Sequence, residues 1–151
     1  MDKYGDDVGV VLKHMPLRSH RKAEIAAIAA QAAHRQGKAW EMHKKLFENR
    51  RALDRADLEK YAEQLGLDVA KFKTDMDDPA VKAEVLADQK AAIAAGVRST
   101  PTCYINGQPI RGAQPFAAFA EVVDVELAIA NELIKSGTPL AEVHAKSAKA
   151  K

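Results

Sequence analysis

The sequence has few of the residues that would reveal its chemistry directly. Its 151 residues include one cysteine, Cys103, so the chain cannot close a disulfide within itself or hold a cysteine-based metal cluster. The redox compartment therefore cannot be inferred from cysteine usage. Aromatic residues make up only 5%, while alanine is abundant. This balance favours helices packed through small side chains over an aromatic-rich β-sandwich.

The sequence also lacks long apolar runs and an excess of charge of one sign. Its 23 basic and 21 acidic residues are interspersed, so no strong field attracts nucleic acid or an anionic membrane, and we expect neither as a partner. No apolar run approaches the ~20 residues of a transmembrane helix, and the first residues do not resemble a signal peptide. With 47% apolar and 29% charged residues, the chain is predicted to form a globular core.

The hydrophobic pattern predicts one buried strand, a block of helices, a hairpin and a long final helix. The β-branched run Val8–Leu12 is typical of a fully buried strand. Ser19 is expected to cap the first helix, and Asp54 and Asp78 to cap later ones. The expected elements are a strand at 8–12, helices at 19–37, about 40–47, 54–66, 69–76 and 78–96, strands at 102–105 and 108–111, and helices at 115–135 and after 138.

The hairpin carries the clearest local signal. Asn106-Gly107 between two strand-like segments predicts a two-residue type I′ turn. Pro109 in the return strand cannot donate to a ladder, which places that strand at a sheet edge.

Three segments of the sequence carry a family resemblance. KYGDDVGVVLKHMPL resembles the second core strand and following loop of bacterial DsbA-like thioredoxin-domain proteins. The segment AAIAAQAAHRQGKAWEMHKKLFENRRALDRADLEKYAEQLGLD is similar to their inserted helical subdomain. The segment GVRSTPTCYINGQPIRGAQPFAAF is similar to their strand–hairpin–helix ending. Together these segments cover the chain from about Lys3 to Lys135.

The resemblance implies an α/β (α+β) fold. It is a thioredoxin-like fold with a helical subdomain inserted at about residues 19–96, and the N-terminal strand and helix of the core are absent. We expect a single truncated domain over residues 1–136. Residues 137–151 are then expected to form a short helix and a basic tail.

The resemblance also implies a substrate-binding loop. It makes the Thr100–Pro101 peptide bond cis and assigns Ser99, Thr100, Pro101 and Thr102 to substrate binding. From the residues alone, an ordinary trans proline that starts a strand is favoured, and the resemblance reverses this preference. No cofactor is expected. No metal is expected either, because the five histidines lack a zinc-helix spacing.

The chain departs from the family at its catalytic pair. The family's C-x-x-C motif precedes the point where this chain begins, so no catalytic residue is assigned. Cys103 could form a mixed disulfide beside the loop. We instead expect it to be a buried, inert residue of a central strand.

The absent strand would leave two buried strands with unpaired backbone groups, each costing ~1–3 kcal/mol against a net stability of ~5–15 kcal/mol. Three arrangements are open. The gene start could lie inside a longer reading frame, the edges could pair with another chain, or residues 8–12 could pair directly with 102–105. We favour the first.

The function predicted is therefore that of a DsbA-family protein related to thiol–disulfide oxidoreductases, inactive as this chain because the C-x-x-C segment is missing. The alternative is a non-catalytic peptide-binding or assembly module, with a possible homodimer through strand edges. A glutathione-using enzyme of the same fold is a third option. The resemblance implies peptide or protein thiols as partners and a periplasmic or other extracytoplasmic location.

Overall fold

The computed structural model describes residues 3–149, which form two compact units. The helical unit is Val11–Gly96, and the hairpin unit is Met1–Val10 together with Val97–Lys151. None of the helices in the described part of the chain is long and apolar enough to cross a membrane.

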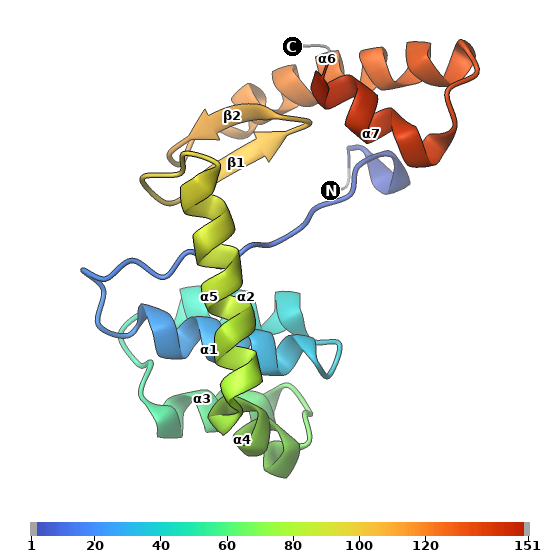
Figure 1. Cartoon of the computed structure of the whole chain (residues 1–151). Coiled ribbons are helices and arrows are strands. Elements are labelled where there is room, and N and C mark those ends of the chain that lie inside the picture. Colours follow the sequence, from blue (N-terminus) through green and yellow to red (C-terminus); the bar gives the residue numbers. More distant parts are fainter. Residues whose placement is uncertain (1–2, 150–151) are drawn as a thin grey trace. The chain divides into compact units, whose positions relative to one another are not determined.

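The helical unit is built around its first helix. This helix contacts each of the other four helices of the unit, and Ala29, Ala32 and Ala33 on it are fully buried. Small side chains let the neighbouring helices approach closely, which is why an alanine-rich segment lies at the centre. The five helices, labelled in Figure 1, are α1 (Ala23–His34), α2 (Ala39–Glu48), α3 (Arg55–Gln64), α4 (Val69–Asp77) and α5 (Pro79–Ala94).

Aspartates cap three of these helices, and two of the caps, Asp54 and Asp78, are those that the sequence predicts. Asp54 begins α3 with a capping box, in which its backbone N–H donates to Asp57 Oδ2 at 3.1 Å. Asp68 caps α4, and Asp78 caps α5 with Pro79 in the first turn. These local interactions fix where the helices begin.

The start of α1 differs from the prediction. Ser19 is not its cap, because residues 17–22 form turns and the helix begins only at Ala23. In these turns the His20 N–H donates to the Leu17 carbonyl and the Ala23 N–H donates to the His20 carbonyl, both at 2.9 Å. The chain therefore turns sharply before it becomes helical.

The core of the helical unit uses one side of α5. Val81 and Val85 are fully buried, whereas Leu86 is 40% exposed and Ile93 also lies at the surface. The expected broad apolar face of this helix is thus covered only in part. Leu86 and Ile93 are seven residues apart and share a stripe about a third of a turn away from the buried valines.

The hairpin unit contains one antiparallel sheet of two strands, β1 (Thr102–Ile105) and β2 (Gln108–Arg111). Asn106 and Gly107 connect them with φ values of 44° and 90°, which confirms the type I′ turn. Tyr104 pairs with Pro109, next to the closing pair of the turn. In this register Pro109 occupies a position without ladder hydrogen bonds, so its missing N–H leaves the hairpin intact.

The predicted strand at 8–12 does not form. These residues have no regular structure, and Val11 is 78% exposed. Within the described residues β1 pairs with β2 alone, so the proposed direct pairing of 8–12 with 102–105 is also wrong. A β-branched run becomes a strand only when a neighbouring strand supplies partners for its backbone, and here none does.

Two helices complete the hairpin unit, α6 (Phe116–Lys135) and α7 (Leu140–Lys149), and a 3₁₀ turn, η1 (Gly5–Asp7), precedes them in the chain. Figure 1 shows α7 folded back along α6. Val143 and Ser147 are buried, and the Ser147 hydroxyl donates to the buried Glu126 carboxylate at 3.1 Å. The segment expected as a short helix and basic tail is therefore helical through Lys149, and Lys151 lies outside the described residues.

Candidate functional site

The loop before β1 is held from both sides. The Thr100–Pro101 peptide bond is cis. The Thr102 hydroxyl donates to the Ser99 carbonyl at 2.7 Å, and the Gly112 N–H at the end of β2 donates to the Pro101 carbonyl at 2.8 Å. Ser99, Thr100 and Pro101 are exposed and Thr102 is partly buried. Hydrogen bonds therefore fix the backbone of a loop whose side chains remain accessible.

Cys103 follows this loop directly and is exposed. The prediction of a buried cysteine in a central strand is wrong. Cys103 pairs with Ile110 of β2, and β1 has no second strand neighbour among the described residues. A sheet of these two strands is too small to shield the Cys103 side chain from solvent. An accessible thiol can react once, but the second thiol needed to complete dithiol exchange is not in this sequence.

His14 belongs to the helical unit, where it stabilises the segment before α1. Its backbone N–H donates to Asp88 Oδ2 at 3.1 Å, and the neighbouring Lys13 forms an ion pair with Asp88 at 2.7 Å. Burial lowers the pKa of the His14 imidazole, although the Asp88 carboxylate opposes this effect. The hydrogen bond from the His14 backbone to Asp88 points to a role of this residue in loop structure.

Three rings lie along α2. The His43 ring lies between Trp40 and Phe47, with centroid distances of 5.8 Å and 4.7 Å. Partial burial lowers the pKa of the His43 imidazole. No group of three histidine, cysteine or acidic side chains within residues 3–149 is arranged to hold a metal ion.

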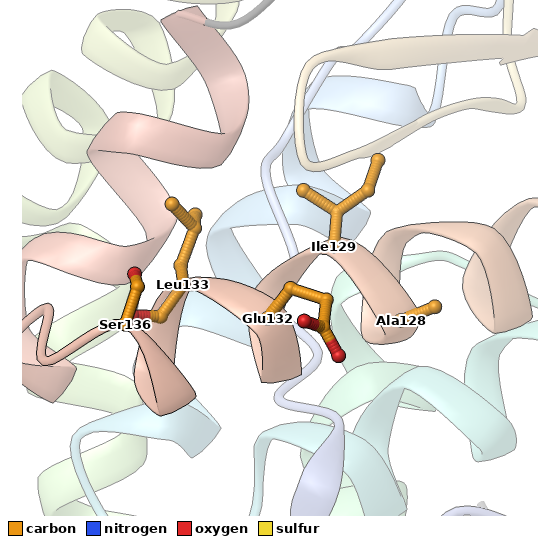
Figure 2. A pocket seen from close by; sticks show the side chains of 5 residues that line it. All are labelled: Ala128, Ile129, Glu132, Leu133 and Ser136. Carbon is orange, nitrogen blue, oxygen red and sulfur yellow. The ribbon is translucent and has the colours of Figure 1, made fainter.

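A shallow surface hollow runs along α6. Figure 2 shows its five lining side chains, which come from this helix and its C-cap residue: Ala128, Ile129, Glu132, Leu133 and Ser136. Its polar groups are already engaged locally, because Glu132 forms an ion pair with Lys135 at 2.7 Å and the Ser136 hydroxyl donates to the Leu133 carbonyl at 2.8 Å. The hollow therefore presents a mainly apolar surface with no reactive group.

A smaller hollow lies in the helical unit, between the turns before α1 and one side of α5. Arg18, His20 and Arg21 line it together with Leu17 and Leu86. The sequence predicts only a loop and the start of a helix over this stretch. The run Arg-Ser-His-Arg at 18–21 is the sequence feature that indicates its positive charge.

The model of the family described as DSBA-like thioredoxin domain matches residues 1–124. The chain belongs to this family. The predicted family and its α/β, thioredoxin-like fold class are thereby confirmed. Within the DSBA-like domain, Ser99, Thr100 and Pro101 form the loop before β1 and Thr102 is the first residue of β1. Cys103, the one cysteine of the sequence, follows directly.

Curated relatives match the DSBA-like domain over part of their length. The chain is 41% identical over 109 residues to a protein named Na(+)/H(+) antiporter NhaA from Herminiimonas arsenicoxydans, covering 72% of this chain and 17% of that one. It is 38% identical over 117 residues to Na(+)/H(+) antiporter NhaA 3 from Salinispora tropica, covering 77% and 18%. The chain thus spans about a sixth of these relatives. No solved structure matches it.

Proposed function

We propose that this chain is the substrate-recognising part of a DSBA-like thiol–disulfide oxidoreductase and that it does not exchange disulfides by itself. The observation that carries the proposal is the single cysteine in a sequence matched by the family over residues 1–124. Dithiol exchange needs an attacking thiolate and a second thiol that resolves the mixed disulfide. Cys103 can supply only one of these.

The substrate-binding role is proposed for Ser99, Thr100, Pro101 and Thr102. Their loop is exposed and is fixed by the two hydrogen bonds described above. Pro101 has no N–H of its own, so neighbouring backbone groups are the ones that would pair with an extended peptide. Peptide or protein thiols are the proposed partners.

We expect this chain to show no insulin reduction above the dithiothreitol background, and the Cys103→Ser variant to behave identically. A dithiol oxidoreductase run in the same assay shows that the conditions permit turnover. Titration with Ellman's reagent should find one reactive thiol per native chain, because Cys103 is exposed. Turnover by the chain that disappears in Cys103→Ser would overturn the proposal.

A second candidate function is a non-catalytic assembly module. Large apolar side chains lie exposed on the hairpin unit, among them Phe116, which is 62% exposed, Tyr104 and Val125. Exposed apolar side chains that form a contiguous patch are typical of surfaces that bind another protein. A second copy of the chain is the proposed occupant.

If the module assembles, light scattering should report about twice the 16.4 kDa chain mass. Phe116→Asp should return the mass to that of a monomer, because a charge replaces an exposed apolar contact. Ala141→Asp, an equivalent change at an exposed position of α7, should leave the dimer intact. A monomer at all concentrations would exclude this function.

The location and the wider context are also proposals. The family resemblance supports a periplasmic or other extracytoplasmic location. The matched relatives named Na(+)/H(+) antiporter carry a similar segment within much longer chains. We propose that such a domain can serve as a module joined to a membrane transporter. Transport itself is not proposed for these 151 residues, because they cover only 17–18% of those relatives.

A further inference from the structure

The hollow before α1 has a volume of about 280 Å³ and combines positive charge with an apolar wall. Arg18, His20 and Arg21 come from the turns at 17–22, and Leu17 and Leu86 supply apolar surface. The volume suits a small molecule or a single chemical group better than a long polymer.

Hydrogen bonds hold the wall of this hollow in place. The Gln89 side-chain amide donates to the Pro16 carbonyl at 2.5 Å, which ties the loop to α5. The His20 N–H donates to the Leu17 carbonyl at 2.9 Å, which closes the turn that presents the arginines. The backbone that carries the cationic residues is therefore held by a structured loop anchored to a helix.

The cationic side chains that line the hollow have no ion-pair partner in the protein. Among the described residues, Arg18, His20 and Arg21 take part in no ion pair or side-chain hydrogen bond. Glu24 also lines the hollow, and its carboxylate forms an ion pair with Lys82 at 2.7 Å. The neighbouring Lys22 forms an ion pair with Asp54. The carboxylate in the lining is thus already paired with a lysine, whereas the two guanidinium groups have no partner.

We propose that this hollow binds a compact oxyanion, a phosphate or carboxylate group, carried by a small ligand with an apolar part. Guanidinium groups match the geometry of both oxyanions and can bind them through two parallel hydrogen bonds. Leu17 and the 40%-exposed Leu86 would contact the apolar part. This inference is independent of the proposed disulfide chemistry, because the hollow lies wholly within the helical unit.

The test is isothermal titration of the full chain with inorganic phosphate, phenyl phosphate and succinate, at one ionic strength set with sodium chloride. We expect phosphate or succinate to bind, and phenyl phosphate to bind more tightly than phosphate if Leu86 contacts the ligand. Leu86→Gln should remove that difference. Binding of phosphate alone would indicate a phosphoryl ligand, and binding of succinate alone a carboxylate ligand.

The Arg18→Gln/Arg21→Gln double variant should lose at least about tenfold in affinity, because two charge-assisted interactions are removed. The matched control is Arg50→Gln/Arg51→Gln, which removes the same charge from two adjacent exposed arginines elsewhere in the unit and should change affinity less than about twofold. Amide chemical shifts should respond to the ligand at residues 17–24. Absence of binding, or an equal loss in both double variants, would overturn the proposal.

Discussion

Phe72→Ala should destabilise the helical unit by about 3–5 kcal/mol. Phe72 on α4 is the largest fully buried side chain in the described chain, at 0% exposure. Its removal loses the burial of the ring and leaves a cavity that the surrounding helices can close only in part. A loss of this size is a large fraction of the ~5–15 kcal/mol that stabilises a typical domain. Urea unfolding followed by circular dichroism measures it.

Phe47→Ala provides the matched control. The same side chain is deleted, but Phe47 on α2 is 64% exposed and its nearest ring neighbour is His43. We expect a change within about 0.5 kcal/mol, as for most surface substitutions. Equal losses in the two variants would mean that Phe72 does not lie in the core of the unit.

Ser147→Glu should detach α7 from α6. Ser147 is fully buried and its hydroxyl lies 3.1 Å from the Glu126 carboxylate, so a new carboxylate would be buried beside an existing one. Burial of an uncompensated charge costs several kcal/mol, more than a short docked helix can offset. Amide hydrogen exchange within Leu140–Lys149 should therefore accelerate at least about tenfold.

Ala145→Glu tests whether the effect comes from position. Ala145 lies on the same helix but is exposed, and glutamate is a good helix former. Exchange in α7 should change less than about twofold in this variant, and exchange in the helical unit should not change in either. Slow exchange of α7 in Ser147→Glu would show that Ser147 is not part of the docking surface.

Local signals in the sequence predicted most of the helices and the hairpin correctly. Asp54 and Asp78 begin helices because their side chains accept hydrogen bonds from the first turn, an interaction that depends only on neighbouring residues. Asn106-Gly107 specifies its turn in the same way, because both residues adopt positive φ at little cost. Such local features form independently of the rest of the fold.

Features that depend on distant partners were predicted less well. Val8–Leu12 has the composition of a buried strand, but a strand also needs a neighbour, and composition does not show whether one is present. The exposure of Cys103 follows from the same cause, because only β2 lies beside its strand in the described sheet. The family resemblance assigned Ser99–Thr102 to substrate binding, but it could not predict how far the residues beside them, such as Cys103, are exposed.

The hollow before α1 was missed for a different reason. The overall charge is nearly balanced, so the composition does not indicate a basic site. A site depends on which charges remain without partners, and that becomes visible only when the ion pair of Lys22 is seen beside the unpaired Arg18 and Arg21. Charge counts along a sequence cannot make this distinction.

Pro109 limits the addition of a further strand to this hairpin. At its position the ring nitrogen faces away from β1, so a strand arriving at the outer side of β2 would find a missing donor midway along a four-residue edge. Edge-to-edge pairing of copies through the outer edge of β2 is disfavoured, which protects a small, partly exposed sheet against fibre formation. Pro109 thus protects one of the two edges of the hairpin, that of β2, against open-ended polymerisation.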